Sequence, residues 1–102
     1  SSDTVKAFRS IPLWHFIDFI EFKNVGPIDC KIVAVEQIEF AKHLHTFTHP
    51  ERAIYILGAE DHGIPTEILN QCWQTIQIKS RFCLNVAVAG SIVMYDRNIK
   101  YA

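Results

Sequence analysis

Residues 53–65 read Ala-Ile-Tyr-Ile-Leu-Gly-Ala-Glu-Asp-His-Gly-Ile-Pro, an apolar run that passes into a polar turn. The almost wholly apolar residues 53–57 are typical of a strand buried on both faces of a parallel sheet. Gly58 to Gly63 predicts a loop. Pro65 suits the first turn of a helix, where a backbone N–H is not required. A strand, a loop bounded by glycines and a helix in this order indicate an α/β protein.

The chain on either side of this unit repeats the same pattern. Residues 31–35 form a second apolar run, and Ile38, Ala41 and Leu44 recur at helical spacing. The expected strands are 31–35, 53–57 and 75–78, and the helices that follow them are 37–47, 65–73 and 86–100. This alternation predicts a parallel sheet with crossover helices. Ligands of such sheets bind beyond the carboxyl ends of the strands, which points to loops 58–63 and 79–85.

The first thirty residues carry a dense apolar segment and a turn. Leu13, Phe16, Ile17 and Ile20 form a stripe at helical spacing, and residues 24–27 indicate a turn. The aromatic residues of this segment have two interpretations, a base-stacking platform or packing in a core or dimer interface, and we favour packing. They are Trp14, Phe16, Phe19 and Phe22.

Composition bounds the class of protein. The chain has 102 residues, of which 49% are hydrophobic and 21% charged, which suits one folded domain. Three cysteines, an odd number, argue against a disulfide framework and favour reduced thiols and a cytoplasmic location. There is no apolar run long enough to span a membrane and no signal-peptide pattern, so we expect no membrane partner.

Charge is unevenly distributed although the net charge is only −1. Residues 75–102 hold four basic side chains, Lys79, Arg81, Arg97 and Lys100, against Asp96. This segment suits either contact with phosphates or a solvated helix face.

Histidines offer further candidates. His43, His45 and His49 suggest a metal site, but the expected helix sends the first two to different faces and ends before the third, so we expect no metal. His62 lies in the expected ligand loop, where it is a candidate for substrate contact.

Two segments together carry a family resemblance. Leu57-Gly58-Ala59-Glu60-x-x-Gly63 resembles motif 2 of the SpoU (TrmH-like) branch of the SPOUT RNA methyltransferases. Cys83-Leu84-Asn85-Val86-Ala87-Val88-Ala89 resembles motif 3 of that branch, with Cys83 where serine is common and Lys79 where a proline is common. The resemblance is clearest over residues 31–102. By residues alone, Asn85 is also a plain helix N-cap, and the small residues after it suit a helix that another backbone approaches closely.

The resemblance implies a fold, a cofactor and an activity. The fold is an α/β domain whose C-terminal helix threads a trefoil knot, and the protein is a homodimer. S-adenosylmethionine is bound in the knot, and the product is a ribose 2′-O-methyl group on tRNA or rRNA. By residue match, Glu60 and Asn85 are catalytic, and Lys79 and Arg81 contact RNA. The cofactor-binding residues would be Leu57, Gly58, Ala59, Gly63, Ile76, Ile78, Leu84 and Asn85.

One family motif has no counterpart. Motif 1 combines an asparagine and an arginine, and Arg9 and Asn24 stand in the wrong order for it. We therefore expect residues 1–102 to be a single knotted domain that lacks an N-terminal part. The alternative is a knotted homologue that binds RNA or a partner without transferring methyl groups.

Overall fold

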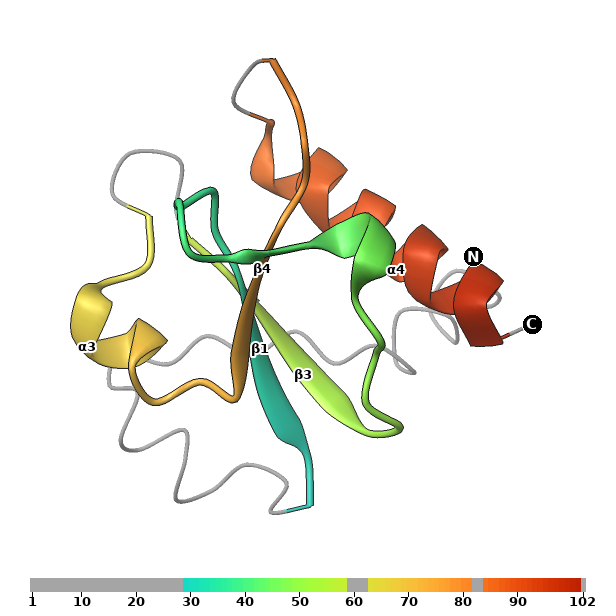
Figure 1. Ribbon diagram of the computed structural model, residues 1–102, viewed down its shortest axis with the longest axis horizontal. Coiled ribbons are helices and arrows are strands. Elements are labelled where there is room, and N and C mark those ends of the chain that lie inside the picture. Colours follow the sequence, from blue (N-terminus) through green and yellow to red (C-terminus); the bar gives the residue numbers. More distant parts are fainter. Residues whose placement is uncertain (1–28, 59–62, 82–83, 102) are drawn as a thin grey trace, which may run out of the picture.

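The computed structural model describes residues 29–58, 63–81 and 84–101. Figure 1 shows strands crossing the middle of the molecule, with α4 at the right of the view and α3 at the left. In chain order the elements are β1 (Lys31–Val35), β2 (Lys42–His43), the 3₁₀ helix η1 (Leu44–Thr46), β3 (Ala53–Leu57), α3 (Thr66–Leu69), β4 (Gln74–Gln77) and α4 (Val86–Tyr101). The segment 1–28, with its expected stripe, turn and aromatic residues, lies outside the described residues.

The sheet has four strands in the order β2-β4-β1-β3, and every pair is parallel. β1 is central because it pairs with β3 on one side and β4 on the other. Its last residue, Val35, is in register with Leu57 of β3 and with Ile76 of β4. The predicted parallel α/β architecture is confirmed, and the carboxyl ends of three strands meet at one edge.

Most predicted elements are present. The strands at 31–35 and 53–57 have the predicted bounds, the third strand begins one residue early, and the final helix ends one residue late. The helix predicted over 65–73 is wrong in length, since α3 stops at Leu69. The Trp73 N–H already donates to the Ile32 carbonyl at 2.8 Å, so pairing with the sheet ends the helix.

The helix predicted over 37–47 is wrong. This segment forms a turn, the short edge strand β2 and η1. Ala41 and Leu44 are buried as their spacing suggested, but Phe40 is 76% exposed. The Gln77 side-chain amide donates to the Ala41 carbonyl at 2.7 Å, and Lys42–His43 pairs with β4. Contacts with β4, which lies far along the chain, therefore replace the local helical bonds.

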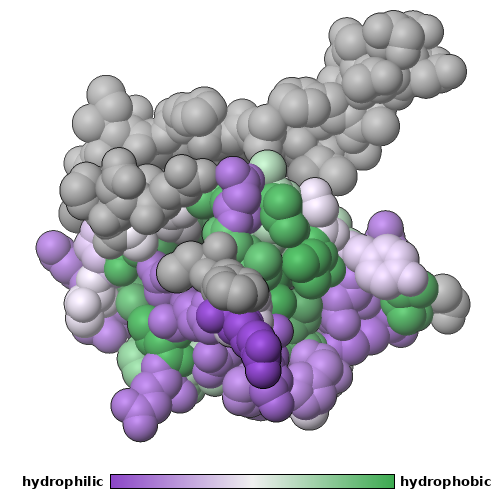
Figure 2. Space-filling view, turned by 90° about the horizontal axis from the view of Figure 1, so that it is seen from above, coloured by the Kyte–Doolittle hydropathy of each residue, from purple (hydrophilic) through white to green (hydrophobic). Residues whose placement is uncertain are grey.

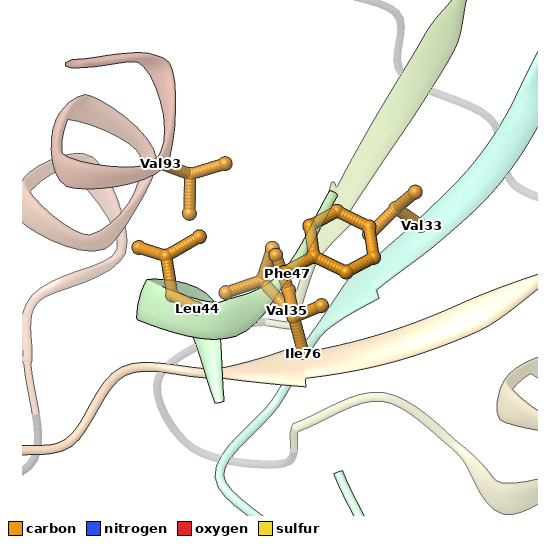
Figure 3. Close-up of a cluster of buried hydrophobic side chains, with 6 residues drawn as sticks. All are labelled: Val33, Val35, Leu44, Phe47, Ile76 and Val93. Carbon is orange, nitrogen blue, oxygen red and sulfur yellow. The ribbon is translucent and has the colours of Figure 1, made fainter. Parts of the chain in front are cut away.

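The core lies between the sheet and the pair η1 and α4. Val33, Val35 and Ile76 come from the two central strands, and Figure 3 shows their side chains turned toward those of Leu44, Phe47 and Val93. Val33 and Val35 share a face because side chains alternate along a strand. The core thus joins α4 to the central strands on which the candidate site is built.

A polar network ties the C-terminal half of α4 to the chain between η1 and β3. His49 is fully buried at its side chain, with Nδ1 2.6 Å from the Tyr55 hydroxyl and Nε2 2.7 Å from Asp96 Oδ2. The Asp96 carboxylate only accepts, so the His49 Nε2–H donates to it, and Nδ1 shares a hydrogen bond with the Tyr55 hydroxyl. Arg97 donates to the same hydroxyl at 2.9 Å, so each of these four side chains has a hydrogen-bond partner in the network.

The basic residues of α4 complete this network. Arg97 donates to the Pro50 and Glu51 carbonyls, and Lys100 to the Leu44 and Phe47 carbonyls. Lys100 also forms an ion pair with Asp96 at 2.8 Å. Arg97 and Lys100 therefore direct hydrogen bonds to backbone carbonyls of the same chain, and the phosphate contact of the C-terminal segment stays a prediction.

The same network shifts two ionisation equilibria. Partial burial opposes ionisation of Asp96, but hydrogen bonds from Lys100 and His49 outweigh it and hold its pKa below the ordinary value. Burial raises the pKa of the Tyr55 hydroxyl although the Arg97 guanidinium opposes that shift. Asp96 is thus a carboxylate whose charge the fold stabilises.

Candidate functional site

A pocket of about 170 Å³ lies at the edge where the carboxyl ends of β1, β3 and β4 meet. It is lined by the last residues of these strands, by residues that follow them and by the start of α4. They are Val35, Glu36, Gln37, Leu57, Gly58, Gly63, Gln77, Ile78, Leu84, Val86 and Ala89. This is the position at which parallel α/β sheets bind ligands.

The register of the sheet explains why these residues converge. Val35 aligns with both Leu57 and Ile76, so the residues that come next leave the sheet together. The Glu36 N–H donates to the Ile76 carbonyl at 3.0 Å, which keeps the end of β1 against β4. The two expected ligand loops therefore contribute to a single pocket, through Gly58 and Gly63 from one and Leu84 from the other.

Close packing at the end of β3 depends on two glycines. A Cβ on Gly58 would lie 2.6 Å from the carbonyl carbon of Gly63 and 2.8 Å from the Ile64 nitrogen. Gly63 has a φ of 66°, a left-handed conformation that side chains disfavour. The chain that returns after the turn thus lies directly against Gly58, and both glycines face the pocket with backbone alone.

The pocket includes most of the cofactor-binding residues predicted from the sequence. Leu57, Gly58, Gly63, Ile78 and Leu84 all line it. Ala59 and Glu60, like His62, lie outside the described residues.

Two predicted site residues lie elsewhere. Ile76 is fully buried in the core and does not line the pocket. Asn85 is exposed between Leu84 and Val86, and its side-chain oxygen accepts the Ala87 N–H at 2.8 Å. This is the N-cap geometry, so Asn85 starts α4 at the mouth of the pocket.

Glu36 and Gln37 were missed by the sequence analysis. The Glu36 carboxylate accepts the Ile64 N–H at 2.6 Å, and the Gln37 amide lies 3.5 Å from the Ser80 carbonyl. The helical spacing over 37–47 does not single them out, although the end of the first strand belongs to the same sheet edge as the other two. A polar pair directly after an apolar strand was the signal that would have identified them.

Small residues near the start of α4 do not bring another described backbone close at Gly90. A Cβ there would meet the Leu57 side chain at 3.6 Å, which is ordinary contact. Ser91 donates to the Ala87 carbonyl of its own helix. The glycine at position 90 is thus not required for packing among the described residues.

Lys79 and Arg81 are exposed and follow β4 on the pocket side of the sheet. Figure 2 shows both hydrophobic and hydrophilic residues on this end of the molecule. A second, shallow hollow of about 370 Å³ lies along α4, lined by Ala87, Val88, Ser91, Ile92 and Tyr95. Val88 is 47% and Tyr95 68% exposed, so α4 presents apolar surface along this hollow.

His43 and His45 are exposed with ring centroids 5.6 Å apart, whereas His49 belongs to the buried network. Among residues 29–58, 63–81 and 84–101, no group of three His, Cys, Asp or Glu side chains has an arrangement that would hold a metal ion. Cys30 and Cys72 are not joined to another described cysteine, and the Cys72 thiol donates to the Ile68 carbonyl at 3.3 Å. None of the helices in these ranges has the length and apolarity needed to cross a membrane.

Fold and pocket define a parallel α/β protein with a pocket at the carboxyl ends of its strands. The chain matches the SpoU rRNA Methylase family over residues 3–95, and it belongs to that family. No curated protein matches it. The family match begins well before residue 31, where the motif resemblance becomes clear. Membership implies an RNA methyltransferase.

Proposed function

We propose that this protein binds S-adenosylmethionine in the pocket at the ends of β1, β3 and β4 and methylates a ribose 2′-hydroxyl of tRNA or rRNA. The observation that carries this proposal is that both motif-bearing loops line the same pocket. Membership of the SpoU family supports the choice of cofactor and substrate, since that family normally uses this methyl donor.

The pocket suits the adenosyl part of the cofactor. Apolar side chains of Val35, Leu57, Ile78 and Leu84 offer walls for a flat ring, and Gly58 leaves backbone groups open to hydrogen bonds. A volume near 170 Å³ is below the roughly 300–1,000 Å³ of sites that enclose a whole ligand of this size. We therefore assign these walls to the ring system alone.

Chemistry at the site requires orientation and proton removal. The bound cofactor supplies an activated methyl group on a sulfonium. The protein has to hold the ribose hydroxyl in line with that group and accept its proton. We assign these tasks to Glu60 and Asn85 by motif match. Asn85 stands next to the pocket-lining Leu84, which supports a position near the ligand.

The proposal also covers the path of α4 and the oligomeric state of the protein. We propose that α4 threads a C-terminal trefoil knot, and that its exposed apolar side forms the interface of a homodimer. Val88, Tyr95 and Ile99 are each about half exposed or more, and such apolar surface often marks an interface. Light scattering that gives a monomer mass at micromolar concentration contradicts the dimer.

Binding and transfer are tested on the full-length protein. We expect calorimetry to detect binding of S-adenosylmethionine and S-adenosylhomocysteine. We expect methyl label to appear on ribose when total RNA is treated and its nucleosides are mapped. Absence of cofactor binding overturns the proposal. Binding without transfer to RNA favours the knotted binding module, which the missing motif 1 motivates.

Contact with RNA phosphates is assigned to Lys79 and Arg81. We expect Lys79→Ala and Arg81→Ala each to reduce the slope of log affinity against log salt by about 1. Lys31→Ala is the matched control, because Lys31 is exposed at the opposite end of β1. Unchanged salt dependence in both variants, measured by RNA filter binding, removes these residues from the RNA surface.

A further inference from the structure

Glu36 is the acidic side chain that the family motifs do not include and that the pocket places beside Gly63. Its N–H is bonded to the Ile76 carbonyl of β4 at 3.0 Å, and its carboxylate accepts the Ile64 N–H at 2.6 Å. One residue thus links the central strand to β4 through its main chain and to the segment after β3 through its side chain.

The Glu36 carboxylate lies where a side chain at position 63 would begin, and this position is a glycine. A Cβ on Gly63 would lie 2.5 Å from Glu36 Oε2. The carboxylate is the end of a flexible side chain and would be able to move, but moving would take it away from the Ile64 N–H. Glu36 and Gly63 therefore depend on each other.

This contact lies in the wall of the pocket assigned to the cofactor, since Glu36 and Gly63 both line it. Gly58 packs on the same stretch, since its Cβ would meet Gly63 and the Ile64 nitrogen. Glu36 therefore fixes the segment that sets how far the backbone at Gly58 stands from a ligand. Gln37, next in the chain, approaches the Ser80 carbonyl at 3.5 Å, a distance too long to carry the same weight.

We propose that Glu36 is a positioning residue for the cofactor site and holds Gly63 and Ile64 against Gly58 through its hydrogen bond to the Ile64 N–H. The inference rests on the proposed function, because the affected ligand is the proposed cofactor. Glu36 acts through Ile64 and Gly63, so its loss alters affinity for the cofactor and leaves the transfer step itself in place. A carboxylate is suited to this role because hydrogen bonds to charged acceptors are stronger than neutral ones.

Three variants of the full-length protein test the proposal by calorimetry with S-adenosylhomocysteine. We expect Glu36→Ala to weaken binding about tenfold or more, as loss of a charge-assisted hydrogen bond implies. Glu36→Gln keeps an oxygen that accepts the N–H, and we expect it to stay within about threefold of the wild type. Glu39→Ala is the control, because Glu39 is exposed in the next turn and does not line the pocket.

Steady-state kinetics separate positioning from general loss of structure. We expect Glu36→Ala to raise KM for S-adenosylmethionine while kcat at saturating cofactor stays within about twofold. Equal binding by Glu36→Ala and the wild type overturns the inference. So does a loss in Glu36→Gln as large as in Glu36→Ala, since the hydrogen bond would then not be the cause.

A ligand-free measurement keeps this inference distinct from the proposed function. We expect Gly63→Ala to lower Tm less in the Glu36→Ala background than in the wild type, because the crowding with the carboxylate is gone and only the strain of positive φ remains. Additive Tm changes overturn the contact. If the wild type binds no cofactor, the proposed function falls, and the two Tm changes still decide whether Glu36 holds the turn.

Discussion

Gly58→Ala is expected to weaken cofactor binding strongly and to destabilise the protein. The added Cβ would lie 2.6 to 2.8 Å from backbone atoms of Gly63 and Ile64. Backbone cannot rotate away as a side chain does, so the end of β3 and the returning chain have to separate. Overpacking of this kind costs roughly 1–3 kcal/mol. We expect affinity for S-adenosylhomocysteine to fall by about 100-fold, which corresponds to about 2.8 kcal/mol.

Gly90→Ala is the matched control for this substitution. Among the described residues its Cβ would meet the Leu57 side chain alone, at 3.6 Å, and the residue lies inside α4. Alanine is better than glycine in a helix by roughly 0.5–1 kcal/mol, so we expect slightly higher stability and unchanged affinity. Calorimetry and urea denaturation of both variants check the pair. Wild-type binding by Gly58→Ala would contradict the close packing at this turn.

Asp96→Ala is expected to be the most destabilising single change in the network under α4. The substitution leaves the Nε2 hydrogen of the fully buried His49 side chain without its acceptor and removes the ion pair with Lys100. A buried polar group without a partner costs about 1–3 kcal/mol. We expect a loss of about 2–3 kcal/mol, measured as the free energy of unfolding in urea. Asp29→Ala, in an exposed turn, is the control and should change this value by less than about 0.5 kcal/mol.

The same residue sets a pH dependence of stability. The folded pKa of Asp96 is lowered, so the folded state favours the carboxylate more than the unfolded state does. Its contribution is present above the unfolded pKa, about 3.9, and is lost as pH falls through the folded value. We expect the stability gap between wild type and Asp96→Asn to be constant from about pH 7 to 5 and to shrink below about pH 4. A gap that grows on acidification would show that the Asp96 charge does not stabilise the fold.

The polar network holds one end of α4, and the other end of this helix lines the pocket. α4 contributes Val86 and Ala89 to the pocket at its first turns and Asp96, Arg97 and Lys100 to the network at its last turns. The helix is therefore fixed at both ends, by the core and pocket on one side and by backbone carbonyls of residues 44–51 on the other. Arg97 and Lys100, two of the basic residues of the C-terminal segment, serve this attachment.

Features of the fold that depend on residues close together in the sequence were predictable. β1 and β3 were identified with the right bounds because strands buried in a parallel sheet read as short apolar runs. The turn at Gly58 to Gly63 was identifiable because glycine permits backbone conformations and approaches that other residues do not. The start of α4 at Asn85 follows from the ability of a short polar side chain to cap a helix, a local property as well.

Features that depend on contacts between distant segments of the sequence were not predictable in the same way. Whether 37–47 forms a helix was decided by pairing of Lys42–His43 with β4 and by the bond from Gln77 to Ala41, between segments more than thirty residues apart. Glu36 gained its position only when the register of β1, β3 and β4 brought three strand ends together. The amino-acid sequence alone determined the strand types, the glycine turn and the family. Tertiary structure decided which polar groups meet, because hydrogen bonds between distant segments depend on the folded geometry of the backbone, and local residue preference does not encode it.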